Sequence, residues 1–355
     1  MEQILLKEKI NIPPKPDGPG EDGNGVFTFI YRGKEIDKIQ ERFGRKGCCV
    51  KIYKNQYPFK EDIKEAWWAG GYKGTSLLEA VDIQNIYSIE GLSPRVYAII
   101  VLIVNGEKHW ACLTEDLGHW REEDSDDKQK ELLRKMTEEG EKYGIQVFND
   151  GRKWNVINGK YVDVQGFRLT PDYKDKLKKR LVGIANIGKW GPFMNYHSIP
   201  ELEISGGRDN EKRIKELHLD EIDFKGKTVL DIGCSEGFFC RYAMDRGAKR
   251  VLGLDLPGVV KPTEELTYFL GYNNIDYQGL DLKTESIQER FDIVLFLSMV
   301  HHVGLPDWVI ESARELFVFE GNGKMEDAEA ITKLNGELKD KTTDLFERPV
   351  IWIKK

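Results

Sequence analysis

Two glycines and two acidic residues gather in one turn, directly after a strongly apolar segment. Thr228–Ile232 has the composition of a buried strand, and Gly233 and Gly237 follow it where a turn into a helix is expected. Glycines let the backbone come close to a ligand, whereas Asp231 and Glu236 would repel a pyrophosphate. The turn therefore favours a cationic ligand over a dinucleotide.

Further acids follow the next two expected strands. Arg250–Asp255 ends in Asp255, at the place where a carboxylate accepts hydrogen bonds from ribose hydroxyls. Ile275–Gly279 leads into Asp281, whose carboxylate is suited to accept a hydrogen bond from an adenine amine. S-adenosyl-L-methionine carries an ammonium and a sulfonium and has no phosphate, so it fits this set of acids. The same acids argue against a dinucleotide-dependent oxidoreductase, because they would repel the pyrophosphate of its cofactor.

The elements that position these residues alternate between strand and helix from Lys225 onward. The expected strands are Thr228–Ile232, Arg250–Asp255, Ile275–Gly279 and Phe291–Leu297. Such alternation is typical of a parallel sheet, because each return to a parallel strand needs a crossover helix. We expect an α/β fold with a Rossmann-like, mostly parallel sheet and helices on both of its faces.

The segment from Tyr196 to the C-terminus resembles the class I S-adenosylmethionine-dependent methyltransferases. The resemblance implies S-adenosyl-L-methionine as the cofactor. It also implies that the two glycines hold the methionine part, that Asp255 holds the ribose and that Asp281 holds the adenine. The predicted cofactor-binding residues lie in the turn and at the strand ends: Asp231, Gly233, Cys234, Glu236, Gly237, Asp255, Leu256, Asp281, Leu282, Leu297 and Ser298.

Methyl transfer is an in-line displacement, so the protein positions the acceptor and can remove its proton. The fourth strand opens onto His301 and His302, and either is a candidate base; a structural role for both is the alternative. Tyr196, His197 and Arg208 lie in a segment similar to the lead-in of methyltransferases that act on small molecules, glycans or transfer RNA wobble uridine. They are the candidate substrate-binding residues, unless they only pack against or cap the lead-in helix.

The predicted acceptor atom is oxygen. No Asn/Asp-Pro-Pro-aromatic signature follows the fourth strand, which disfavours amino methylation of adenine or glutamine. No Pro-Cys pair follows it either, which disfavours a cysteine nucleophile acting on a pyrimidine. An RNA-modifying methyltransferase would need Lys174–Arg180, Lys189 and Arg208 to form one basic face. A non-catalytic cofactor-binding or kinase-like module is the other alternative.

The N-terminal part has a weaker resemblance to the kinase-like small-molecule phosphotransferases. Lys51 and Glu79 would be the pair of a strand lysine and a helix glutamate. Asp150 and Asn155 have the spacing of a catalytic loop, and Asp163 occupies a metal position.

Other segments agree with this resemblance, and some depart from it. Gly91–Tyr97 resembles the turn and strand that follow the helix, and Thr114–Gly118 resembles the hinge that binds adenine. However, Phe148 replaces a histidine, and Asp163-Val164-Gln165 replaces Asp-Phe-Gly. The resemblance therefore implies a degenerate lobe used for acceptor recognition rather than an active kinase.

The length of 355 residues is enough for two domains. Residues 1–25 are expected to be a flexible lead-in, residues 26–175 a smaller α+β domain, and residues 176–355 the methyltransferase domain. In the smaller domain the patterns predict a small sheet with one packed helix at Thr75–Glu90, and Asn158-Gly159 predicts a hairpin.

Composition indicates the cellular compartment of the protein and the class of its partner. The five cysteines form no C-x-x-C pair, so no disulfide framework and no metal site are expected, and a cytoplasmic location fits best. The longest apolar run, Val96–Val104, is too short to cross a bilayer, so no membrane partner is expected. A net charge of −7 gives no general attraction for nucleic acid. The expected partner is a small-molecule, glycan or transfer RNA acceptor.

Overall fold

The computed structural model groups the chain into two compact units. It describes residues 5–12, 28–53, 68–69, 72–73, 76–104, 106–118, 126–147, 156–162, 164, 167–187, 196–323, 326–334, 336–343 and 347–355. One unit is Met1–Leu177 with Tyr268–Asn274, and the other is Lys178–Thr267 with Ile275–Lys355. The division falls inside helix α4 (Tyr173–Ile187), close to the boundary expected from the sequence.

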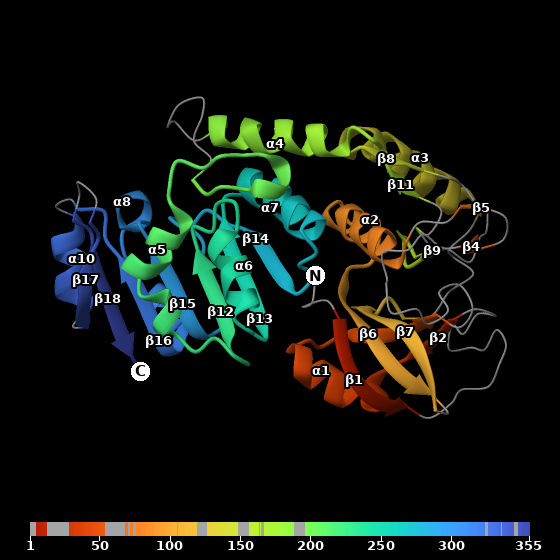
Figure 1. Ribbon diagram of the computed structural model, residues 1–355, viewed down its shortest axis with the longest axis horizontal. Coiled ribbons are helices and arrows are strands. Elements are labelled where there is room, and N and C mark those ends of the chain that lie inside the picture. Colours follow the sequence, from red (N-terminus) through yellow and green to blue (C-terminus); the bar gives the residue numbers. More distant parts are fainter. Residues whose placement is uncertain are drawn as a thin grey trace. The chain divides into compact units, whose positions relative to one another are not determined.

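The second unit is built on a seven-stranded sheet in the order β14-β13-β12-β15-β16-β18-β17 (Figure 1). The first five strands in this order are parallel, whereas β18 runs antiparallel to both of its neighbours. The expected mostly parallel α/β sheet is thereby confirmed. The strands are β12 (Thr228–Ile232), β13 (Arg250–Asp255), β14 (Ile275–Gly279), β15 (Phe291–Leu297), β16 (Ala313–Glu320), β17 (Glu337–Lys341) and β18 (Pro349–Lys354).

Helices join these strands and cover the sheet. Right-handed crossovers run outward from β12 in both directions, which puts the helices of the two directions on opposite faces. Both faces are therefore buried, and the central strands are almost continuously apolar. The helices are α5 (Asn210–Glu216), α6 (Phe238–Asp245), α7 (Pro257–Phe269), α8 (Val300–Val303), α9 (Asp307–Glu311) and α10 (Glu326–Leu334), with 3-10 turns η3 (Pro200–Leu202) and η4 (Leu219–Glu221).

The first unit contains a five-stranded sheet in the order β1-β6-β7-β3-β2, in which only β1 and β6 are parallel. Two helices pack on it rather than the single one expected: α1 contributes to one apolar cluster, and α2 to another. Leu5–Ile12, expected to be part of a flexible lead-in, instead forms β1. The remaining elements are β2 (Thr28–Tyr31), η1 (Gly33–Ile36), α1 (Asp37–Phe43), β3 (Cys48–Tyr53), α2 (Leu77–Ile89), β6 (Val96–Val104) and β7 (Glu107–Glu115).

The predicted hairpin is present in the same unit. Asn158 and Gly159 both have positive φ angles, 48° and 74°, as a two-residue turn requires. They join the antiparallel strands β9 and β10. The other short elements are β4 (Trp68–Ala69), β5 (Tyr72–Lys73), α3 (Asp126–Tyr143), β8 (Ile145–Gln146), β9 (Val156–Ile157), β10 (Lys160–Tyr161) and β11 (Arg168–Leu169).

None of the helices within the described ranges has the length and the apolar character that spanning a membrane requires.

Aromatic packing in the second sheet makes a direct test of the fold. Phe296 is fully buried in β15, and its ring stacks between Phe317 and Phe319 of β16 at centroid distances of 6.3 and 6.2 Å. We expect Phe296→Ala to lower the free energy of unfolding by about 3 to 5 kcal/mol, because it removes buried contacts and leaves a cavity. Urea unfolding of the full chain measures this change.

Leu338→Ala is the matched control, since Leu338 is 57% exposed on β17. It should change the free energy of unfolding by less than about 0.5 kcal/mol. Equal effects of the two substitutions would contradict the placement of Phe296 in the core.

Candidate functional site

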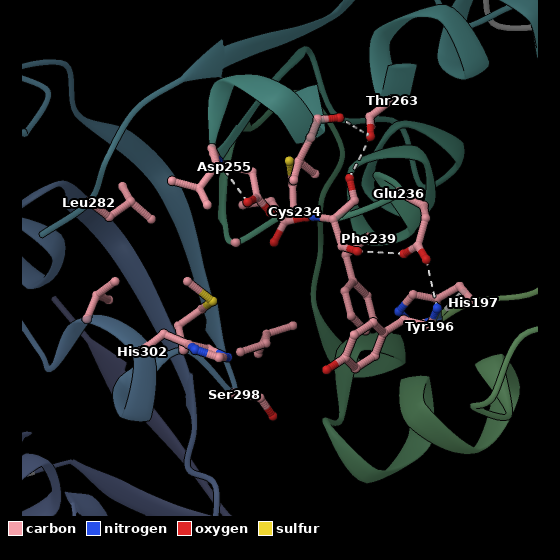
Figure 2. A pocket seen from close by; sticks show the side chains of 18 of the residues that line it. Tyr196, His197, Cys234, Glu236, Phe239, Asp255, Thr263, Leu282, Ser298 and His302 are labelled. Atoms are coloured by element: carbon pink, nitrogen blue, oxygen red, sulfur yellow. Dashed lines mark hydrogen bonds between the residues drawn. The ribbon is translucent and has the colours of Figure 1, made fainter. Parts of the chain in front are cut away.

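A cavity of about 530 Å³ opens at the carboxyl ends of β12, β13, β14 and β15, entirely within the second unit. All predicted cofactor residues except Gly237 line it, and so do all three predicted substrate residues. Figure 2 shows Asp255 and Leu282 along one side of the cavity and Tyr196 on another, with Cys234 between them. The strand order reverses direction at β12, where an open α/β sheet forms its binding crevice.

The glycine turn adopts a backbone that few other sequences tolerate. Gly233, Ser235 and Gly237 have φ angles of 79°, 46° and 69°, in the left-handed region. A Cβ atom at Gly233 would collide with the side chain of Met299, and one at Gly237 with the hydroxyl of Tyr277. Gly237 therefore supports the turn from behind, while Gly233 forms part of the cavity wall.

Asp231 and the two nearby thiols are buried beneath this turn. The Cys240 thiol donates to Asp231 Oδ2 at 3.2 Å. Burial raises the pKa of Asp231 to about 7. Burial also raises the pKa of the Cys234 thiol well above its ordinary value. The Cys234 thiol is therefore protonated near neutral pH and has no thiolate character.

Glu236 joins the turn to the segment that precedes the sheet. Its Oε1 accepts a hydrogen bond from the backbone N–H of Tyr196 at 2.7 Å, and its Oε2 accepts one from Ser235 Oγ at 2.7 Å. Both contacts are drawn in Figure 2. The Glu236 carboxylate therefore uses part of its hydrogen-bonding capacity to hold the turn and the preceding segment together.

Asp255 and Asp281 place carboxylates at the ends of β13 and β14. Asp255 accepts from the backbone N–H of Ser235 at 2.9 Å and of Leu256 at 2.8 Å. Burial raises the pKa of Asp255, although these two bonds act in the opposite direction. Asp281 is exposed and accepts from the backbone N–H of Lys283 at 3.0 Å. Each carboxylate oxygen has two lone pairs, so both groups keep capacity for a ligand.

Apolar side chains lie next to these two carboxylates. Leu256, Leu280 and Leu282 line the cavity, and Leu256 is 53% exposed. An exposed leucine beside a buried carboxylate is suited to cover a planar ring.

The segment before the sheet folds into a compact loop on the cavity wall. His197 pairs with Arg208, and Ile199 pairs with Ile204, in isolated β-bridges. Gly206 packs so tightly against the backbone of His197 that a Cβ atom there would collide with it. The backbone thus fixes the positions of all three predicted substrate residues.

His197 serves in this loop as a neutral, buried ring. Its Nδ1 lies 2.7 Å from Asn210 Oδ1, and the ring stacks on Phe238 at a centroid distance of 4.4 Å. Burial lowers the pKa of His197 to about 4. The ring is therefore uncharged near neutral pH, and its contacts position the loop.

Glu320, at the end of β16, organises a second group of polar side chains. It is fully buried and accepts from Arg213 Nη2 at 2.6 Å and from Ser298 Oγ at 2.7 Å. Arg348 Nη1 lies 3.8 Å from Glu320 Oε1 and donates to Ser298 Oγ at 2.9 Å. Ser298, a predicted cofactor residue, is held by this network with a φ of 55°.

The two candidate bases differ in their placement. His301 and His302 lie in the short helix α8 with ring centroids 3.7 Å apart. Only His302 is among the residues that line the cavity.

Several cavity residues were missed by the sequence reasoning. Glu320 could have been predicted from the sequence, because it is an acid at the carboxyl end of a buried strand, as Asp255 is. The others have no comparable pattern: Arg213, Phe239, Thr263 and Met299.

The kinase-like pair is not formed in the first unit. Lys51 Nζ donates to the backbone oxygen of Val162 at 3.2 Å, and Glu79 accepts from the backbone N–H of Leu169 at 3.1 Å. No ion pair between these two side chains is found in the described part of the chain. The expected catalytic-loop and metal-position residues lie outside the described residues: Phe148, Asp150, Asn155, Asp163 and Gln165.

Comparison with known proteins shows what kind of domain the second unit resembles. Residues 212–328 match the family model of the FtsJ-like methyltransferases. The match runs from α5 to α10 and so contains the strand ends that line the cavity. The second unit carries a class I methyltransferase domain. The resemblance stated from the sequence is thereby confirmed, and S-adenosyl-L-methionine is the cofactor of this class of domain.

Curated relatives match the same methyltransferase domain. The ubiquinone biosynthesis O-methyltransferase of Pseudomonas fluorescens (strain Pf0-1) is 31% identical over 116 residues, which are 29% of this chain and 50% of that protein. Its counterpart in Bradyrhizobium sp. (strain ORS 278) is 32% identical over 117 residues, 33% of this chain and 45% of that protein. The chain spans about half the length of these relatives.

Solved structures also resemble parts of the chain. An S-adenosylmethionine-dependent methyltransferase from Mesorhizobium loti is 27% identical, with a TM-score of 0.28 over 32% of this chain and 55% of that one. The bifunctional kinase-methyltransferase WbdD is 16% identical, with a TM-score of 0.40 over 49% of this chain and 46% of that one.

The buried state of His197 predicts a pH dependence of stability. Its pKa is about 4 in the folded protein and about 6.5 in an unfolded chain, so the unfolded state takes up the proton first as the pH falls. The contribution of His197 is therefore complete above pH 6.5 and is lost towards pH 4. We expect this loss to reach about 3 kcal/mol and to be absent from His197→Gln. Urea unfolding at pH 7.5, 5.5 and 4.5 measures it.

His218→Gln is the control, because the contribution of His218 to stability changes with pH in the opposite direction. A hydrogen bond to Glu221 raises the pKa of His218, so its contribution is present at low pH and is lost as the pH rises. If the unaltered protein and His197→Gln had parallel stability curves, His197 would not be buried as described.

The tight packing at Gly206 gives a second prediction. Gly206→Ala should lower the free energy of unfolding by about 1 to 3 kcal/mol, because the added methyl group meets backbone that cannot easily move. Gly258→Ala is the control, since a Cβ atom there has open space and alanine favours its helix. Urea unfolding at pH 7.5 compares them, and a destabilised Gly258→Ala with an unaffected Gly206→Ala would contradict the loop structure.

Proposed function

We propose that the chain is an enzyme that transfers a methyl group from S-adenosyl-L-methionine to an oxygen atom of a small molecule or a glycan. The observation that carries this proposal is the cavity at the strand ends. There, an acid-bearing glycine turn and the carboxylates of Asp255 and Asp281 line one space inside a methyltransferase domain.

The residues present fit this cofactor. Asp231, Glu236 and Asp255 line the cavity near the glycine turn, where a sulfonium and an ammonium are favoured and a pyrophosphate is not. The cavity volume of about 530 Å³ lies within the range of small-molecule sites. When bound, S-adenosyl-L-methionine supplies a methyl group that is activated by its sulfonium.

We assign a role to each residue that would hold the cofactor. Asp255 accepts hydrogen bonds from the ribose hydroxyls, using the lone pairs that its two backbone bonds leave available. Asp281 accepts from the adenine amine, while Leu256 and Leu282 pack against the ring. The left-handed backbone at Gly233 lets the methionine part approach the turn.

His302 is the residue that we assign to proton removal. It lines the cavity, whereas His301 does not, and histidine is the side chain best suited to accept a proton near neutral pH. The buried thiols of Cys234 and Cys240 are protonated and are not assigned a nucleophilic role. The relatives named as O-methyltransferases support an oxygen acceptor.

The RNA-modifying alternative has less support. Arg180 forms an ion pair with the buried Glu265, and Arg208 lines the cavity instead of extending a basic face. Lys189 lies outside the described residues. A non-catalytic module remains an outcome that turnover assays decide. Recognition of the acceptor by the first unit stays a prediction.

We also assign the protein to the cytoplasm. All five cysteines are buried and free of disulfides, which agrees with a reducing compartment.

Binding of the reaction product tests the cofactor assignment. We expect calorimetric titration with S-adenosylhomocysteine to give a micromolar dissociation constant. Asp255→Asn should raise this constant about 10- to 100-fold, because hydrogen bonds to a charged acceptor contribute about 1.5 to 3 kcal/mol. Asp307→Asn, which changes an exposed aspartate of α9, should leave it unchanged.

NADH serves as the comparison ligand in the same titrations. Binding of NADH but not of S-adenosylhomocysteine, or equal affinity in Asp255→Asn and the unaltered chain, would overturn the assignment.

A further inference from the structure

Two polar side chains of the cavity have no task in holding the cofactor. Arg208 and Tyr196 both line its wall, and the Arg208 guanidinium lies over the Tyr196 ring at 4.8 Å. Among the described residues, none forms an ion pair or a hydrogen bond with the guanidinium, and none forms a hydrogen bond with the Tyr196 hydroxyl. The guanidinium and the phenol therefore line the cavity with donors that no described side chain uses.

The backbone holds this pair in place. The N–H of Arg208 donates to the carbonyl oxygen of Tyr196 at 3.0 Å. Glu236 binds the N–H of Tyr196, and Gly206 allows the two strands of the loop to approach closely. The guanidinium is thus positioned before any ligand arrives, which lowers the entropy lost on binding.

The charges around Arg208 leave a positive excess. Arg213 and Arg348 both act electrostatically on Arg208, and both are engaged with the buried Glu320. Glu216 lies 3.9 Å from Arg213 and is also bound by Thr343. Burial and the charges of the two other arginines lower the pKa of Arg208, although Glu320 acts in the opposite direction.

We propose that Arg208 and Tyr196 form an anion-binding subsite that holds a carboxylate or phosphate group of the methyl acceptor. A guanidinium presents parallel N–H groups that match the two oxygens of such a group, and the phenol adds a third donor. The inference rests on the proposed function and narrows it, since it selects acceptors that carry an anionic group near the reacting hydroxyl. Neutral alcohols and unsubstituted sugars are excluded as the preferred acceptors.

The cofactor itself carries a carboxylate, which has the same chemistry. The experiment therefore needs one arm for the acceptor and one for the cofactor. Arg208→Gln removes the charge, Arg208→Lys keeps it without the planar fork, and Arg246→Gln is the matched control. Arg246 lies over the ring of Tyr242 at 5.1 Å, in the same kind of stacking, but it is exposed and does not line the cavity.

The acceptor arm uses inorganic phosphate as the probe. The thermal midpoint of the full chain, saturated with S-adenosylhomocysteine, is compared in sodium phosphate and in sodium chloride of equal ionic strength. We expect phosphate to raise the midpoint of the unaltered protein by about 3 °C relative to chloride. Arg246→Gln should keep this shift, Arg208→Lys should keep part of it, and Arg208→Gln should lose it. Because phosphate also stabilises proteins non-specifically, the difference between the two glutamine variants is the decisive quantity.

The cofactor arm measures two dissociation constants in the same variants. S-adenosylhomocysteine has the amino-acid carboxylate, and 5′-methylthioadenosine lacks it. We expect Arg208→Gln to bind both within twofold of the unaltered protein. A tenfold loss for S-adenosylhomocysteine alone would overturn the proposal, because Arg208 would then hold the cofactor carboxylate.

Equal phosphate shifts in Arg208→Gln and Arg246→Gln would also overturn the proposal. If the unaltered chain bound no S-adenosylhomocysteine at all, the proposed function would fail, and the assignment of an acceptor subsite would fail with it. These outcomes are distinguishable, because the first leaves cofactor binding intact and the second does not.

Discussion

The reversal of strand order at β12 is the constraint on which the rest of the second unit depends. Right-handed crossovers lead from β12 towards β14 on one side and from β15 towards β16 on the other, so the loops after β12 and β15 diverge. A space opens between them that no side chain of the sheet fills. Every residue assigned to the cofactor reaches this space, or supports it, because it follows the end of a parallel strand.

Acidic and basic side chains lie in different parts of the cavity. The acids Asp231 and Asp255 lie at the ends of β12 and β13, where a cationic ligand would compensate their charge, and burial raises the pKa of Asp231 to about 7. The arginines belong to the lead-in loop, to α5 and to the segment before β18, and they gather around Glu320. The cavity is therefore dipolar, with an acidic half built by the central strands and a basic half built by elements that precede or follow them.

The four strands whose ends line the cavity were predictable with their bounds. For β12, β13 and β15 the reason is that a strand covered on both faces is a short, mostly apolar run, whereas the edge strand β14 has no such run. The Asn158-Gly159 turn was predictable for a local reason as well, since few residue pairs accept two positive φ angles. In contrast, α1 buries only Ile39 and Phe43, and seven residues with two apolar positions give too weak a helical period.

Contacts between distant residues were not predictable. The bond between Arg213 and Glu320 joins positions 107 residues apart, and no local pattern encodes such a pairing. The expected ion pair of Lys51 and Glu79 is not formed either, and each side chain binds a backbone group far away in the sequence. The sequence therefore indicated the strand ends that line the cavity as a set, whereas it indicated the loop before the sheet only as single residues.

A continuous relay of hydrogen bonds connects the two halves. Asp255 accepts from the N–H of Ser235, the hydroxyl of Ser235 donates to Glu236, and Glu236 accepts from the N–H of Tyr196. A ligand that shifts Asp255 therefore acts on Tyr196, over whose ring the Arg208 guanidinium lies. Energetic coupling between sites is reciprocal, so each of the two ligands would change the affinity for the other by the same factor. The relay thus provides a route by which occupation of one half of the cavity alters binding in the other.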